Sequence, residues 1–123
     1  MIEIKIRSDK ENILSFKISD HALRDRDAIM AGDAYDMVCN TVSVLSQSVI
    51  IGLDEVLKLN CNYEMMDGYL AVDLEGFTPE EICEAQVLLK TFKLSLDSVI
   101  LSLDQSFGKD KREKYISLKL EEV

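Results

Sequence analysis

The residues best suited to covalent chemistry are the one histidine, His21, and Cys39, which stands in the segment Asp36-Met37-Val38-Cys39. This segment opens a long apolar pattern typical of a helix, so we expect Asp36 to be the N-cap and Cys39 the third helical residue. A helix N-terminus and a nearby imidazolium can lower a thiol pKa from about 8.5 to roughly 3.5–7.5, and the thiolate is the nucleophile. Histidine accepts and returns protons near neutral pH. The pair is the minimum set for thiol nucleophilic catalysis.

Each of these residues also has a structural interpretation. A small buried hydrophobe is the commonest fate of a cysteine such as Cys39, and a hydrogen-bonded structural histidine is the usual default for His21. Ser43 lies one helical turn beyond Cys39 on the same predicted face, where it could hydrogen-bond a group in a site or simply be a small residue at a helix contact. We expect Cys61 and Cys83 to pack in the core.

Composition narrows the class of protein. The 123 residues are 47% hydrophobic and 30% charged, which predicts one globular domain spanning 1–123. We find no apolar run that approaches the ~20 residues of a membrane span, and the N-terminus has the pattern of a strand rather than of a targeting peptide. Three cysteines without paired spacing indicate a reducing cytoplasm and neither a metal nor another cofactor, although zinc held by His21 and the cysteines remains a weaker alternative.

The net charge of −9 bears on possible partners. It argues against direct nucleic-acid binding, which depends on lysine and arginine. It would favour encounter with a basic protein or peptide, although simple solubility is the better explanation of the charge alone. The chain also lacks glycine-rich phosphate-binding motifs.

Hydrophobic periodicity predicts the order ββαββαβ. Alternating residues indicate strands at 1–7 and 14–20, a hairpin of strands 61–65 and 69–74 around Asp67-Gly68, and a last strand at 116–121. Spacings of three and four indicate a helix from Asp36 to about Leu59, and the capping box Thr78-Pro79-Glu80-Glu81 opens a second helix that ends at Gly108. Residues 22–35 are expected to form an active-site loop. The predicted fold class is α+β, with two helices packed on a mainly antiparallel sheet.

The second predicted helix is apolar on more than one face. Beyond its main stripe, it carries Val87, Leu88, Leu94, Ile100 and Leu101. Such a helix is either deeply buried or lies at a subunit interface.

Several motifs together resemble one family. Asp20-His21-Ala22 ends a predicted strand, and Asp36-Met37-Val38-Cys39-Asn40-Thr41-Val42-Ser43 opens a helix after a loop. A His-Ala step followed by Asp-x-Val-Cys, with Ser four residues after the Cys, resembles the ribosomal-processing cysteine protease family (Prp). The similarity continues through Gly52-Leu53-Asp54-Glu55-Val56-Leu57, the Asp67-Gly68-Tyr69-Leu70 hairpin and Ala85-Gln86-Val87-Leu88-Leu89, and so covers almost the whole chain.

The resemblance implies a homodimeric endopeptidase that removes the N-terminal extension of a large-subunit ribosomal protein, cutting after an aromatic residue. It implies that Cys39 is the nucleophile and His21 the base, with Asp36 and Ser43 as supporting residues. The implied substrate is basic, which fits the acidic chain. In this mechanism, backbone N–H groups at the helix start, around Cys39 and Asn40, would stabilise the oxyanion.

This chain departs from the family pattern at three places. Asp20 stands where the family usually has Gly before the His, Ala34 replaces a Gly before the Asp-x-Val-Cys step in a longer loop, and Asn40-Thr41 replace two small residues. Bulkier side chains there could narrow a cleft in which a substrate backbone must approach closely. A non-catalytic, diverged paralogue that binds a basic protein segment is therefore the alternative function.

Overall fold

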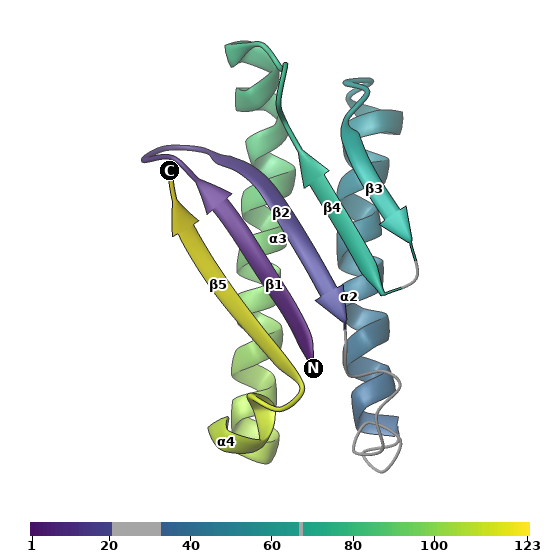
Figure 1. Ribbon diagram of the computed structural model, residues 1–123, viewed down its shortest axis with the longest axis vertical. Helices are drawn as coiled ribbons and strands as arrows, with labels where there is room; N and C mark the ends of the chain where they lie inside the picture. Colours follow the sequence, from purple (N-terminus) through teal and green to yellow (C-terminus); the bar gives the residue numbers. More distant parts are fainter. Residues whose placement is uncertain (21–32, 67) are drawn as a thin grey trace.

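The computed structural model describes residues 1–20, 33–66 and 68–123 and has a five-stranded sheet with both long helices on one face (Figure 1). Its elements are β1 (Ile2–Ser8), β2 (Ile13–Asp20), α2 (Asp33–Ile51), a π-helical turn η1 (Gly52–Val56), β3 (Asn62–Met66), β4 (Tyr69–Asp73), α3 (Pro79–Phe107), α4 (Lys109–Arg112) and β5 (Ile116–Glu122). The predicted α+β class and the order of the main elements are confirmed. The expectation that the chain is one domain stays a prediction.

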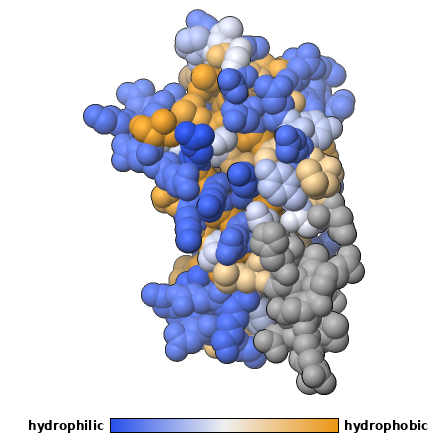
Figure 2. Space-filling model, in the orientation of Figure 1, coloured by the Kyte–Doolittle hydropathy of each residue, from blue (hydrophilic) through white to orange (hydrophobic). Residues whose placement is uncertain are grey.

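The sheet has the strand order β3-β4-β2-β1-β5. Neighbouring strands are antiparallel except β1 and β5, which are parallel, so the sheet is mainly antiparallel as predicted. The register places Ile18 of β2 opposite both Ile4 of β1 and Leu70 of β4. Because strand side chains alternate between faces, this register gathers the apolar residues on the helix side. The face that looks away from the helices is largely hydrophilic (Figure 2).

The core lies between the sheet and the two helices. Ile2, Ile4 and Ile6 of β1 are at most 1% exposed, and Phe16 of β2 stacks on Phe92 of α3 with ring centroids 4.4 Å apart. The helices contribute the stripes that the spacing predicted, with Val42, Val49 and Leu53 buried on the first and Ala85, Leu89, Phe92 and Leu96 on the second. Val56, near the end of the predicted helix, is 73% exposed because the π-helical turn shifts the helical phase after Ile51.

The first helix ends earlier than expected. It passes through η1 and stops at Val56 rather than about Leu59. Lys58 and Asn60 adopt φ angles of 58° and 53°, a left-handed conformation that cannot continue a right-handed helix. The Asp54 carboxylate accepts a 2.8 Å hydrogen bond from the Cys61 amide, which holds the chain as it turns into β3.

The second helix begins and ends where predicted. Thr78 Oγ1 accepts from the Glu81 amide at 3.2 Å, and Glu81 Oε1 accepts from the Thr78 amide at 2.9 Å, which completes the capping box. Gly108, with φ of 85°, follows its last residue. Within this helix the Gln86 amide group is buried and reaches β2, where it accepts from the Ile13 N–H at 2.7 Å and donates to the Ile13 carbonyl at 2.9 Å. This contact joins α3 to the sheet.

One expectation about packing is wrong. Cys83 is exposed on α3 rather than in the core, whereas Cys61 is buried as predicted. Met65 and Met66 of β3 are 52% and 61% exposed. Of the two alternatives for the extra apolar residues of the second helix, deep burial does not hold in the single chain for Val87, Leu94 and Leu101, which are 58–73% exposed, and a subunit interface stays a prediction. Alternation gives the face that a residue points to, but not whether another element covers it.

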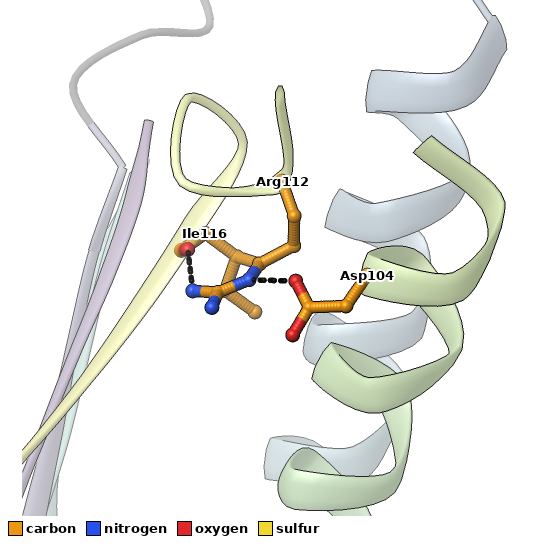
Figure 3. Close-up of polar contacts among 3 residues, drawn as sticks. All are labelled: Asp104, Arg112 and Ile116. Atoms are coloured by element: carbon orange, nitrogen blue, oxygen red, sulfur yellow. Dashed lines mark hydrogen bonds and ion pairs between the residues drawn. The ribbon is translucent and has the colours of Figure 1, made fainter. Parts of the chain in front are cut away.

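One arginine, Arg112, holds the connection between α3 and β5 by hydrogen bonds to both elements (Figure 3). Arg112 Nε donates to Asp104 Oδ1 at 2.7 Å, and Arg112 Nη1 donates to the Ile116 carbonyl at 3.4 Å. The Ile2 amide donates to the Tyr115 carbonyl at 2.8 Å, which starts the parallel pairing of β5 with β1.

The segment Met37–Val56 is long and apolar enough, by length and composition only, to cross a membrane. This corrects the expectation that no run approaches that length. Its buried side, which includes Val38, Val42 and Leu53, packs in the core beneath the sheet. The same composition is typical of a core helix.

Candidate active site

Cys39 lines a hollow of about 410 Å³ between α2 and one end of the sheet. Ser43 and Asn40 of α2 line the same hollow, so the structure brings together three of the residues that the sequence singled out. Ile2, Ile18 and Leu70 of the sheet form its apolar side, among other residues. None of the described residues that line it is charged.

Cys39 is half-buried, and it lies farther into the helix than expected. Helix α2 begins at Asp33, so Asp36 is inside the helix and not its N-cap, and Cys39 is the seventh helical residue instead of the third. Beyond the first four residues, each helical N–H bonds the carbonyl four residues back. The amides of Cys39 and Asn40 therefore belong to the helix ladder, which argues against their predicted role as unpaired oxyanion donors.

Ser43 is held by its own helix. Gln47 Nε2 donates to Ser43 Oγ at 2.8 Å, and Ser46 Oγ donates to the Ser43 carbonyl at 3.0 Å. Because the Gln47 amide occupies an acceptor position of the Ser43 hydroxyl, the O–H of Ser43 is left to donate elsewhere. Gln47 and Ser46 also line the hollow. These two residues add a hydroxyl and an amide to the polar side of the hollow.

Two of the predicted site residues cannot be placed beside Cys39. His21 lies outside the described residues, and of Asp36 only the backbone, within α2, is described. Strand β2 ends at Asp20, and Ile18, two residues earlier, lines the hollow. His21 is the next residue along the sequence after Asp20.

Sequence reasoning missed the residues that the β3–β4 hairpin contributes. Met65, Met66 and Tyr69 line the hollow opposite the residues of α2. The Asp67-Gly68 turn signal did predict the hairpin, and Met66 pairs with Tyr69 across it. It did not indicate that this end of the hairpin would face Cys39, because that proximity depends on long-range packing of α2 on the sheet.

The other two cysteines differ from Cys39 in their surroundings. Burial, together with the Asp54 carboxylate beside it, raises the pKa of the Cys61 thiol to about 12, so Cys61 is not a nucleophile at neutral pH. Cys83 is exposed on α3. Among the residues that the structure describes, no three histidine, cysteine, aspartate or glutamate side chains are grouped so as to hold a metal ion.

The model of the cysteine protease Prp family matches residues 1–107. The chain belongs to the Prp family of cysteine proteases. No curated protein matches it.

Solved structures have the same fold over nearly the whole chain. SMU.848 from Streptococcus mutans is 22% identical, with a TM-score of 0.73 over 100% of this chain and 96% of that one. The ribosomal processing protease Prp of S. aureus, in complex with a covalently linked product peptide, is 18% identical, with a TM-score of 0.64 over 98% and 100% of the two chains. A hypothetical protein from Staphylococcus aureus is 16% identical, with a TM-score of 0.55 over 98% and 100%.

Proposed function

We propose that this Prp-family protein is a cysteine endopeptidase that removes the N-terminal extension of a large-subunit ribosomal protein. The observation that carries the proposal is the position of Cys39, half-buried in a hollow that it lines together with Ser43 of the same family motif and whose described lining residues carry no charge. The hollow has an apolar side from the sheet and a side of hydroxyl and amide groups from α2. Such a lining suits an apolar peptide segment whose backbone needs hydrogen-bond partners.

In the proposed reaction, the Cys39 thiolate attacks the scissile carbonyl carbon and His21 carries the thiol proton. Collapse of the tetrahedral intermediate breaks the C–N bond, and His21 gives its proton to the leaving amine. A water molecule then hydrolyses the thioester, returning the acid product and the thiol. Ser43, oriented by Gln47, would donate to the bound peptide, and Asp36 would support the motif.

The test is mass spectrometry of the organism's own N-terminally extended ribosomal protein after incubation with this protein. We expect one new N-terminus after an aromatic residue, absent with Cys39→Ala, Cys39→Ser or His21→Ala. Cys83→Ala is the matched control because it removes an exposed thiol outside the hollow, and it should cleave like the wild type. Cleavage by Cys39→Ala would exclude Cys39 as the nucleophile.

A non-catalytic module that binds a basic protein segment is the second candidate. The observation that favours it is Asn40, an exposed residue that lines the hollow where the family usually has a small residue. The pH profile of Cys39 alkylation distinguishes the two functions. An activated thiol reacts well below the ordinary midpoint of about 8.5, whereas binding without cleavage and with an ordinary profile would favour the module.

We also propose that the protein is a cytoplasmic homodimer that pairs through the outer face of its helices. Val87, Leu94 and Leu101 of α3 are exposed and spaced by seven residues, so they share one helix face, and Met37, Val44 and Ile51 repeat this spacing on α2. Exposed apolar patches of this kind indicate interaction sites. Helix α2 has no charged residue from Met37 to Leu53, which reduces repulsion between two acidic copies.

The oligomeric state tests this part of the proposal. Sedimentation velocity of the full chain should give a dimer for the wild type and a monomer for Leu94→Lys. Leu120→Lys is the matched control, because Leu120 is similarly exposed but lies on β5, and it should remain dimeric. A monomeric wild type, or a dimer unaffected by Leu94→Lys, would contradict this interface.

A further inference from the structure

Strand β3 is an edge strand of the sheet, since among the residues that the structure describes it pairs with β4 alone. In an antiparallel pair, alternate residues point both backbone polar groups toward the partner or away from it. Two residues separate Met66 from its partner Tyr69, and the closing pair of such a two-residue hairpin is hydrogen-bonded. By alternation, Tyr63 and Met65 then point their N–H and C=O groups outward. The edge therefore offers two backbone donors and two acceptors.

The side chains of the same two residues are also uncovered. Tyr63 and Met65 pair with Val72 and Leu70, whose side chains are 1% and 8% exposed and so mark the helix side of the sheet. Tyr63 and Met65 share that side but are 48% and 52% exposed. The helices thus cover β4 and leave β3 half uncovered. The exposed side chains of Tyr63 and Met65 therefore form an apolar surface beside the outward-facing backbone groups.

The two edges of the sheet differ in their protection against pairing. Strand β5 carries Lys119, Glu121 and Glu122 among its seven residues, and charges of this kind normally block an edge. Strand β3 has Glu64 as its one charged residue, no proline, and a continuous register with β4. Of the two edges, β3 is the one open to another strand.

The open edge leads directly into the candidate active site, because Met65 and Met66 line the hollow that contains Cys39. We propose that the substrate docks as a sixth strand: an extended peptide pairs with the outward backbone groups of Tyr63 and Met65, and its apolar part enters the hollow. This inference rests on the proposed peptidase function and names how that site binds its substrate. Main-chain pairing gives the affinity, and alternate side chains give the specificity.

The charges along β3 specify the chemistry of the peptide. Near Met65 and Met66 the described lining of the hollow is uncharged, which favours apolar residues. Glu64, next to Met65 in the sequence, lies on the opposite face of the sheet, and Asp73 and Glu75 lie at the other end of β3, beside Asn62. At about 3.3 Å per residue, a lysine or arginine two to four residues from the apolar segment would reach these carboxylates. The occupant is therefore an extended peptide with an apolar segment followed or preceded by basic residues.

The test uses full-length Cys39→Ala protein and a labelled synthetic peptide that spans the extension and the first mature residues of the ribosomal protein. Binding is measured by fluorescence anisotropy for a series of peptides, each methylated at one backbone nitrogen. Loss of one ladder hydrogen bond weakens binding about fivefold, and the methyl group adds steric exclusion. We expect weakening by about tenfold or more at every second position in the docked stretch and less than about twofold between them. An equal effect at all positions, or no binding, would overturn the proposal.

Protein variants give a second, independent readout. Met65→Lys should weaken peptide binding, whereas Leu120→Lys, the same change at the other edge, should not. An equal loss of peptide binding in both variants would show that β3 does not dock the peptide. A change in oligomeric state with Met65→Lys alone would also show this, and it would assign the β3 edge to a second copy of the chain. Cleavage by the wild type is scored separately. If the effect of methylation alternates along the peptide but the wild type does not cleave it, the docking proposal stands and the peptidase proposal is wrong. If the wild type cleaves the peptide but the effect of methylation does not alternate, the peptidase proposal stands and the docking proposal is wrong.

Discussion

Replacing Gly52 tests how closely α2 and α3 approach. A Cβ atom at Gly52 would lie 2.6 Å and 2.8 Å from the two Cδ atoms of Leu88, nearer than real Cβ atoms pack. Such overpacking costs about 1–3 kcal/mol, although the half-buried Leu88 side chain can shift to relieve part of it. Alanine regains about 0.5–1 kcal/mol over glycine within a helix. We therefore expect Gly52→Ala to lower the free energy of unfolding by about 1 kcal/mol and the melting temperature by about 4 °C.

The assay is a double-mutant cycle by urea denaturation. Leu88→Ala removes the atoms that the new Cβ would meet, so Gly52→Ala in that background should be neutral or should stabilise by about 0.5–1 kcal/mol. The change of sign between the two backgrounds is the specific prediction. If Gly52→Ala is equally destabilising with and without Leu88, the glycine is required for the π-helical turn itself, and the explanation by close approach is wrong.

Three further predictions concern polar and ionisable side chains. Because the Cys61 thiol has a pKa of about 12 when folded and 9.0 ordinarily, the unfolded chain ionises first. The free energy of unfolding should thus fall between pH 9 and 12, and Cys61→Ala should remove that part of the slope in pH-dependent denaturation. Gln86→Leu leaves the Ile13 N–H and C=O unpaired and should cost about 1–3 kcal/mol by urea denaturation. Arg112→Met loses the Asp104 pair and should cost about 1 kcal/mol, with faster hydrogen exchange where β5 begins.

The features predicted best are those that local chemistry determines. Alternation of isoleucines places β1, and the capping box at Thr78 with Gly108 at the far end brackets α3 almost to the residue. In each case the signal lies within a few residues: apolar alternation marks a strand with one buried face, and capping hydrogen bonds mark the start of the helix. The start of α2 was predicted wrongly, because Asp36 has the residue type of an N-cap but lies three residues inside a helix that begins at Asp33.

The candidate site was predictable only in part. The motif singled out Cys39 and Ser43, and both line one hollow, because residues four apart on a helix share a face. The contribution of Tyr69 and Met65 depends on where α2 lies on the sheet, and that is decided by packing between segments distant in sequence. The geometry of the pair His21–Cys39 stays a prediction.

A simple comparison of widths explains why β3 is uncovered. Helices pack about 10 Å apart and strands about 4.8 Å apart, so two helices cover roughly four strands. A five-stranded sheet with two long helices on one face must therefore leave about one strand's width without cover, and periodicity in Tyr63 and Met65 cannot show which edge that is. The structure leaves both edge strands partly uncovered, since Leu120 of β5 is 61% exposed, and of the two edge strands β3 is the one that lines the hollow with Cys39. A third covering element would bury Met65 and close the edge at which we propose that the peptide docks, so the exposure of this strand and the access of a substrate to the thiol have the same geometric origin.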